Sequence, residues 1–361
     1  MPMNKVVHAA QRAAFSAAID AAINAVRGKG PEHMAEQAVK LVNLAQPLLA
    51  HRYPDADWDK VRSFVSDPNS KWMEYAYKAI NEIDPHILKM NTLNLVYEGM
   101  FAGYNYVMEL RRKYDCNMPW ILLFDPTSAC NLHCKGCWAA EYGNRLNLSF
   151  EDMDRIVTEG EALGIHWYMC TGGEPTCRKE DLFKLAAKHQ NSVFHLFTNG
   201  TLIDEAFCDE LLRIGNFFVS VSIEGFEESN DGRRGEGHFQ KVLDAMDLMH
   251  SRKIPFGVSI CYTSQNYLTV TSDEFLDMLI EKGCIFAWYF HYMPVGVNAS
   301  TELLLTPEQR VYMHDKVREI RGLEGGKELF AIDFQNDGEF VHGCIAAGER
   351  YCHINANGDV E

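Results

Sequence analysis

Residues 120–137, WILLFDPTSACNLHCKGC, join a short apolar run to three closely spaced cysteines. Residues 120–124 have the length and composition of a buried strand. Cys130, Cys134 and Cys137 follow it with the spacing C-x3-C-x2-C. A loop this short can aim three thiolates at one metal centre, and iron–sulfur clusters are held by Cys thiolates, usually four. A centre with three protein ligands keeps one coordination position open, as catalytic zinc sites do.

Two other interpretations of this spacing stay open. The three cysteines would also suit zinc, with His133 or a distant residue as the fourth ligand. They would also allow one disulfide and a spare thiol, which a reduced compartment disfavours.

Composition narrows the class of protein. The chain has 361 residues, of which 47% are hydrophobic and 23% charged, as in a soluble globular protein. Its net charge of -16 disfavours a nucleic-acid partner, which would require a basic face. The first ten residues lack the pattern of a signal peptide, and no apolar run reaches the length of about 20 residues that spans a bilayer. We therefore expect a cytoplasmic protein without a transmembrane segment, whose cysteines are reduced and bind metal.

Residues 1–114 are predicted to form an all-helical N-terminal domain. Its last helix carries an apolar stripe at three- and four-residue spacing, which we expect to pack against the next domain. A platform for a long apolar substrate is the alternative. The stripe consists of Leu93, Val96, Met100, Tyr104, Val107 and Leu110. The expected helices cover residues 9–26, 32–49, 58–65, 71–83 and 91–113.

Residues 115–300 alternate between short apolar runs and helical segments. This alternation predicts parallel strands joined by crossover helices. Six such units are too few for a closed eight-stranded barrel, so we predict an α/β fold with an open or partial, TIM-like barrel. The expected strands cover residues 120–124, 166–170, 193–197, 217–223, 256–261 and 285–290.

Polar and glycine-rich segments follow each predicted strand, at its carboxyl end. In barrels this end is where active sites are built, so the shared position of the segments weakens the structural-zinc interpretation. They are the three cysteines and residues 171–175, 198–201, 220–224, 263–266 and 291–296.

Two of these segments predict specific chemistry. Gly172 and Gly173 allow the backbone to approach a ligand closely, and Glu174 beside them offers a carboxylate for an ammonium group. Ser220, Ser222 and Glu224 alternate with apolar residues, so they share one face of a strand. Such a polar row is costly to bury unless a polar group such as a sugar diol binds it. A buried water network is the alternative.

Together, the C-x3-C-x2-C loop and the following Gly172-Gly173-Glu174-Pro175 resemble the radical S-adenosylmethionine (radical SAM) enzymes. The resemblance covers residues 120–296. It implies a partial (β/α)6 barrel and a 4Fe-4S cluster on Cys130, Cys134 and Cys137, with SAM chelating the fourth iron through its amino and carboxylate groups.

The resemblance also implies roles for residues around SAM. Gly172, Gly173 and Glu174 match the motif that receives the methionine amino group. Ser222 and Glu224 match the strand that contacts the ribose.

Residues 231–234 resemble a D-x-x-R element, in which Arg234 would face the SAM carboxylate, with Arg233 as the alternative. The family usually has an aromatic residue directly before the third cysteine, beside the adenine. Here that position is Gly136, and the aromatic residue is Trp138, so the resemblance assigns no adenine contact.

Residues 301–361 are predicted to begin with a helix capped by Thr306 and Pro307. Residues 340–360 then resemble the opening of a SPASM or twitch extension, which carries auxiliary clusters. This implies Cys344 and Cys352 as candidate ligands of a possible auxiliary 4Fe-4S cluster; two ordinary cysteines near a hairpin are the alternative. Because the family's next cysteine would follow Glu361, we expect a truncated small C-terminal extension.

The resemblance implies an enzyme that cleaves SAM reductively and abstracts hydrogen from a peptide, protein or apolar substrate. It also implies flavodoxin or ferredoxin as the electron donor. The alternative is a non-catalytic iron–sulfur or zinc-binding protein with a structural or electron-transfer role.

Overall fold

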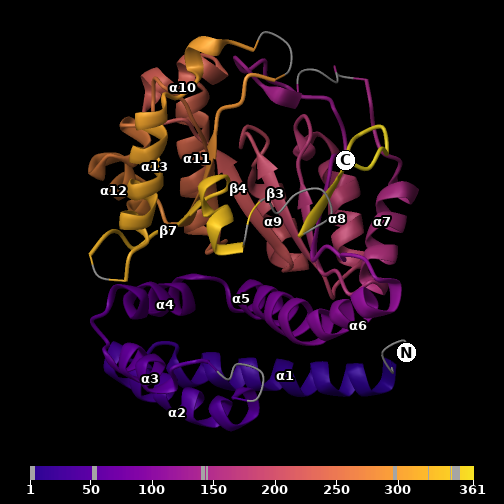
Figure 1. The fold of residues 1–361 in the computed structure, drawn as a ribbon, viewed down its shortest axis with the longest axis vertical. Helices are drawn as coiled ribbons and strands as arrows, with labels where there is room; N and C mark the ends of the chain where they lie inside the picture. The colour runs from indigo at the N-terminus through magenta and orange to yellow at the C-terminus, as the bar shows by residue number, and fades with distance from the viewer. Residues whose placement is uncertain are drawn as a thin grey trace.

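The computed structural model describes residues 5–50, 55–139, 143, 145–295, 299–323, 325–341, 343 and 350–361. A layer of helices lies at one end of the molecule, and a parallel sheet with its own helices forms the rest (Figure 1). As predicted, the described chain is helical up to the first strand. The layer consists of α1 (Lys5–Val26), α2 (Pro31–Leu49), α3 (Trp58–Ser66), α4 (Lys71–Glu82), α5 (Pro85–Thr92), the π-helix η1 (Leu93–Gly103) and α6 (Tyr104–Tyr114).

The sheet confirms the predicted partial α/β barrel. It has eight parallel strands in the order β7-β6-β5-β4-β3-β2-β1-β8. The six predicted strands are β1 to β6, whereas β7 and β8 come from the segment predicted as the C-terminal extension and add one strand to each edge. The strands are β1 (Ile121–Phe124), β2 (Trp167–Cys170), β3 (Val193–Thr198), β4 (Phe217–Ser222), β5 (Phe256–Tyr262), β6 (Cys284–His291), β7 (Phe330–Asp333) and β8 (Tyr351–Ile354).

The two faces of the sheet differ because side chains alternate along each strand. The outer face packs against the crossover helices and forms the main hydrophobic core, with Phe124, Tyr168 and Phe194 fully buried. The inner, concave face forms a separate cluster that is rich in aromatic rings. The helices are α7 (Phe150–Ala162), α8 (Lys179–Lys188), α9 (Glu205–Ile214), α10 (Glu227–Arg234), α11 (His238–Ser251), α12 (Asp273–Glu281) and α13 (Pro307–Ile320). Within the described residues, no helix combines the length and apolarity needed to cross a membrane.

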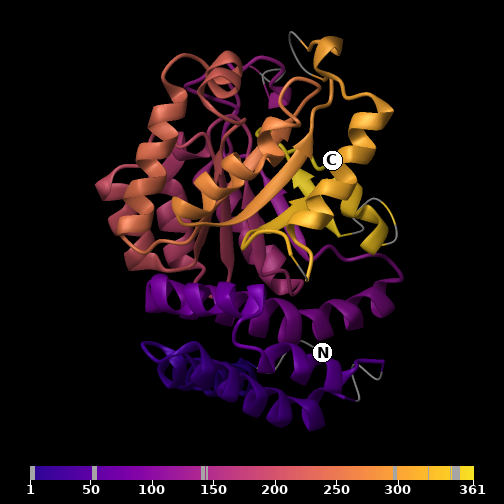
Figure 2. The same ribbon diagram turned by 90° about the vertical axis from the view of Figure 1, so that its left-hand side faces the viewer.

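The helical layer lies at the amino ends of the strands, and Figure 2 shows the same arrangement from the side. Asn94 of η1 donates hydrogen bonds from Nδ2 to the carbonyl oxygens of Gln190 and Ser192, 3.0 Å each, directly before β3. Functional loops at the carboxyl ends of the strands are therefore on the side facing away from this layer.

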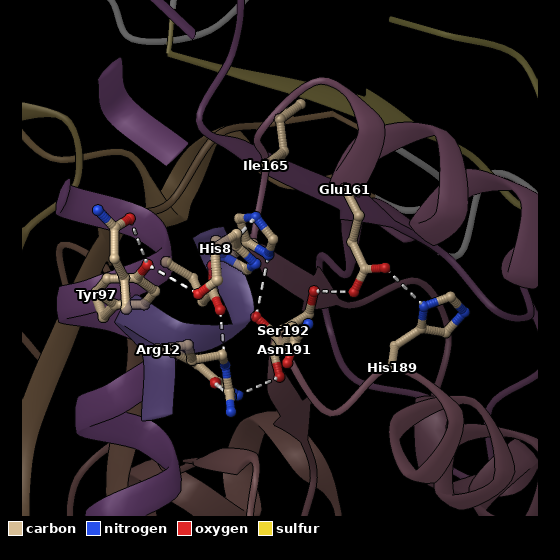
Figure 3. A network of polar contacts seen from close by, with 12 residues as sticks. His8, Arg12, Tyr97, Glu161, Ile165, His189, Asn191 and Ser192 are labelled. Atoms are coloured by element: carbon tan, nitrogen blue, oxygen red, sulfur yellow. Dashed lines mark hydrogen bonds and ion pairs between the residues drawn. The ribbon is translucent and has the colours of Figure 1, made fainter. Parts of the chain in front are cut away.

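A buried carboxylate joins α1 to the π-helix. Glu98 is fully buried on η1, and its oxygens lie 2.7 Å from Arg12 Nε and 2.8 Å from His8 Nε2 (Figure 3). His166, which precedes β2, lies 4.0 Å from the same carboxylate. Arg12 of α1 thus compensates the charge of Glu98, and His166 adds a contact from a second segment.

The predicted apolar stripe is wrong at its centre. Leu93, Val107 and Leu110 are buried, but Met100 is 55% and Tyr104 48% exposed. The reason is that residues 93–103 form a π-helix, whose hydrogen bonds run to the fifth residue and rotate its side chains out of α-helical phase.

We predict that Glu98→Gln lowers the free energy of unfolding by about 3 kcal/mol, because it leaves the partly buried Arg12 without its charged partner. The matched control is Asp20→Asn, which removes the more exposed Lys89–Asp20 pair between α1 and α5 and is expected to cost less than about 1 kcal/mol. Urea unfolding measures both; equal costs would contradict the structural role of Glu98.

A second prediction concerns pH. Burial works to lower the pKa of His189, but its contacts with Glu161 and Asp154 outweigh this and raise it above 6.5 (Figure 3). Because the folded pKa is raised, His189 stabilises the fold below about pH 6.5, and this contribution is lost as the pH rises through the folded pKa. The difference in unfolding free energy between the wild type and His189→Gln should therefore shrink from pH 6 to pH 8. A difference that stays constant or grows would refute this assignment.

Candidate active site at the carboxyl end of the barrel

The loop after β1 carries the three cysteines, and we call residues 125–139 the cysteine loop. It lies against the glycine pair that follows β2. Gly173 N donates to Thr127 O at 2.9 Å, and Glu174 N donates to Ala129 O at 2.7 Å. A Cβ on Gly173 would lie 2.2 Å from Ala129 O, so no side chain fits there. The glycine pair thus allows a close approach to the backbone of the cysteine loop, while the predicted approach to a ligand stays a prediction.

Two other loops also form hydrogen bonds with the cysteine loop. The side chain of Asn131 accepts a hydrogen bond from Asn199 Nδ2 and donates one to Thr201 Oγ1, both 2.8 Å. Lys135 N donates to Arg233 O at 2.9 Å, at the end of α10. The loops after β2, β3 and β4 thus fix the conformation of the cysteine loop.

The three thiols are free and half-buried. The pKa of Cys130 is raised to about 11, mainly by burial. A hydrogen bond from Leu132 N opposes this shift, and the nearby Glu174, Cys134 and Cys137 add to it. Burial also raises the pKa of Cys134, against the Arg234 and Arg233 guanidinium groups.

The donors suit an iron–sulfur centre in kind, since they are three thiols of one loop and a bound metal deprotonates its thiol ligands. Within the described part of the chain, no group of three or more His, Cys, Asp or Glu side chains is placed to hold a single metal ion. A 4Fe-4S cluster does not require such a group, because each cysteine binds a different iron.

Glu174 turns into the protein. Its carboxylate is fully buried and accepts hydrogen bonds from Thr176 N (3.0 Å), Thr176 Oγ1, Thr198 Oγ1 (2.6 Å) and Asn199 N (2.7 Å). Burial raises its pKa, and these hydrogen bonds oppose that shift. In this structure the carboxylate joins the β2 loop to the β3 loop, a contact that the sequence analysis missed. The polar residues at the end of β3, Thr198 and Asn199, could have indicated this contact in the sequence.

The predicted polar row of β4 divides into separate contacts. Ser220 is buried and lies 2.7 Å from His195 Nε2, whereas Ser222 is only half-buried and pairs in register with Ser259. Glu224 lies beyond the strand and has different partners.

Glu224 and Arg234, predicted to contact different groups of SAM, contact each other here. Glu224 Oε1 is 2.5 Å from a terminal nitrogen of both Arg233 and Arg234, and its Oε2 accepts from Cys261 N at 3.1 Å. Arg234 Nη1 is also 4.0 Å from Cys134 Sγ. Two guanidinium groups and a buried carboxylate therefore border the cysteine loop.

Gly136 has no side chain, and an aromatic ring from another loop occupies the space beside it. Gly136 has a φ of 64°, and a Cβ there would lie 2.6 Å from the ring of Tyr292, which follows β6 and is buried. Tyr292 is fixed by a hydrogen bond from Ser300 N to its hydroxyl oxygen, 3.0 Å. The absence of a side chain at residue 136 was the sequence signal for this contact.

Of the two C-terminal cysteines, the structure describes Cys352, which lies on the outer face of the sheet. Cys352 pairs in register with Leu122 on β8 and packs against the outer hydrophobic core, where burial raises its pKa. Cys344 lies outside the described residues. The hairpin expected near the C-terminal cysteines is present, with an antiparallel bridge between Ile354 and Val360.

We predict that Gly173→Ala disrupts the cysteine loop, because the added Cβ would overlap the backbone of Ala129. The free energy of unfolding should fall by more than about 2 kcal/mol, as expected for a steric clash with backbone, and iron bound after anaerobic reconstitution should decrease. Gly232→Ala is the control, because its Cβ would meet nothing within 4 Å and should change stability by less than about 1 kcal/mol. Equal iron content in both variants would argue against the packing role of Gly173.

Comparisons with known proteins agree with this geometry. The family model of the radical SAM superfamily matches residues 124–279. The Fe-coproporphyrin III synthase of Methanosarcina barkeri is 27% identical over 62% of this chain and 57% of its own length. The mycofactocin maturase MftC of Mycolicibacterium smegmatis is 29% identical over 67% of this chain and 63% of its own.

Among solved structures, Streptococcus suis SuiB bound to S-adenosylmethionine has a TM-score of 0.60 at 17% identity and covers 88% of this chain and 71% of its own, which shows a shared fold. The chain spans less than two thirds of each of the two curated relatives named above. The half-barrel, the cysteine spacing and the family match together place residues 124–279 of this chain in the radical SAM superfamily.

Proposed function

We propose that the protein is a radical SAM enzyme whose Cys130, Cys134 and Cys137 hold a 4Fe-4S cluster. The cluster would supply reductive cleavage of SAM, followed by hydrogen abstraction from a peptide, protein or apolar substrate. The observation that carries this proposal is the placement of three free thiols in one loop, packed on the glycine pair at the carboxyl end of a parallel half-barrel. This is the end of a barrel at which catalytic groups gather.

Residues around the cysteine loop would bind and orient SAM. The backbone of Gly172 and Gly173 would receive its amino group, while Glu174 keeps the neighbouring loops in place. Ser222 is accessible for the ribose.

The remaining charged groups of SAM would meet Glu224 and Arg234. Because these two residues are paired with each other, binding would require them to exchange part of that contact for the ribose and carboxylate. Such an exchange keeps both charges compensated throughout.

We further propose that residues 1–114 are a helical domain, 115–300 the catalytic barrel and 301–361 the start of an auxiliary-cluster region. An auxiliary cluster on Cys344 and Cys352 would require Cys352 to leave the apolar core against which it packs. A flavodoxin or ferredoxin would supply the electron.

The names of the curated relatives point to different classes of substrate. One curated relative is named for a porphyrin and another as a maturase, so the names favour neither a peptide nor a small apolar substrate.

The direct experiment is anaerobic incubation of the reconstituted protein with SAM and dithionite. We expect 5′-deoxyadenosine from the wild type and none above background from Cys134→Ala, because the cluster would lose a ligand. Cys116→Ala, an exposed cysteine after α6, is the matched control and should retain full product formation.

The alternative, a non-catalytic iron–sulfur or zinc protein, predicts no SAM binding. Calorimetric titration of the reconstituted wild type with SAM separates the two. Absence of both binding and 5′-deoxyadenosine would exclude the proposed enzyme.

A further inference from the structure

The inner face of the half-barrel carries aromatic rings from strands that are not neighbours. We call Trp167, His195, Phe197, Trp288 and Phe290 the aromatic face. His195 and Phe197 of β3 have ring centroids 5.6 and 5.5 Å from that of Trp288 on β6, although β4 and β5 lie between these strands. Curvature of the sheet therefore brings the rings of β3 and β6 into contact.

Beyond Phe218, β4 and β5 present small side chains to the same side, which leaves room for this contact. Gly257 is opposite Ser220 in register, and a Cβ on Gly257 would lie 2.4 Å from the Phe286 ring. Nearer the carboxyl ends, Ser222 pairs with Ser259, and both are half-buried. Aromatic rings thus cover β4 and β5 near Gly257. Ser222 and Ser259, which lie nearer the cysteine loop, stay partly accessible.

Three polar atoms of the aromatic face have no hydrogen-bond partner among the described residues. They are the indole Nε1 atoms of Trp167 and Trp288 and the Nδ1 atom of His195. Trp288 is only 8% and His195 only 3% exposed. Buried polar groups are nearly always paired in folded proteins, and an indole N–H can only donate. The buried indole N–H of Trp288 therefore lacks the hydrogen-bond acceptor that such a donor normally has.

The aromatic face is also uncharged. None of the described inner positions on β2 to β6 is Asp, Glu, Lys or Arg. Burial lowers the pKa of His195 to about 3, so its imidazole is neutral at physiological pH. Charged groups occur beyond these strands: Glu224 with Arg233 and Arg234 at the rim, and Asp125 with His353 of β8.

We propose that the aromatic face binds a planar, uncharged part of the substrate that carries a carbonyl acceptor for the Trp288 indole N–H. Stacked rings favour a flat partner, and an unpaired buried donor favours an acceptor over a plain hydrocarbon. A charged group would lose its hydration without a countercharge. The role as substrate site rests on the proposed function, whereas the binding preference does not.

Three probes of one shape test this proposal on the reconstituted full-length protein. They are 9-fluorenone, fluorene, which lacks the carbonyl, and 9-fluorenone-4-carboxylate, which adds a charge. Equilibrium dialysis should show 9-fluorenone binding about fivefold more tightly than fluorene, the factor that one neutral hydrogen bond contributes, and the carboxylate binding most weakly.

Trp288→Phe keeps an aromatic ring but removes the donor. It should reduce 9-fluorenone binding to the level of fluorene and leave fluorene binding unchanged. Trp72→Phe, in α4 of the helical layer, is the matched control and should change neither affinity. Ser259→Phe would place a ring where the inner face is still accessible, and it should abolish binding of all three probes. This variant provides a second test if Trp288→Phe does not fold.

Equal binding of fluorene and 9-fluorenone, tightest binding of the carboxylate, or an unchanged ratio in Trp288→Phe would overturn the proposal. Tighter binding of 1-dodecanol than of 9-fluorenone would also overturn it, in favour of an alkyl chain. The proposed function fails separately, through absence of SAM cleavage, because probe binding does not depend on that reaction.

Discussion

The backbone of Gly173 lies against the carbonyl groups of Ser128 and Ala129, at a distance that excludes a side chain. This contact places the cysteine loop on the edge of the sheet, because a four-residue strand such as β1 cannot by itself orient a long loop. Hydrogen bonds from Gly173 and Glu174 to the cysteine loop keep the two loops in register. The remaining contacts of the site build on this pair of loops.

Two buried carboxylates extend the same arrangement around the rim. Glu174 joins the β2 loop to the β3 loop through neutral donors, and Glu224 joins the end of β4 to α10 through two guanidinium groups. Burying a carboxylate is costly unless donors surround it, so each one requires its neighbouring loops to be in place. The rim is thereby preorganised, and a cofactor would bind to loops whose positions are already set.

The two faces of the sheet have different roles. The outer face stabilises the fold, and the inner face is the one proposed to bind the substrate. Helices cover only the outer face, where the residues of the main core are buried. The inner face keeps a second cluster of rings and small residues with unpaired donors. A half-barrel allows this because its concave side has no crossover helices. At the opposite end, the helical layer is held by the Glu98 network and leaves the carboxyl ends of the strands accessible (Figure 3).

Three features could be predicted from the amino-acid pattern: the helical start of the chain, the six alternating strands and the position of the cysteines after the first strand. These features depend on local spacing and composition, which are properties of each segment alone. Other features became visible only in the folded chain: β7 and β8 extend the sheet, η1 breaks the apolar stripe, Glu174 turns inward, and Tyr292 lies where Gly136 has no side chain. These contacts join segments far apart in the chain, and their partners are set by which strands the sheet places side by side.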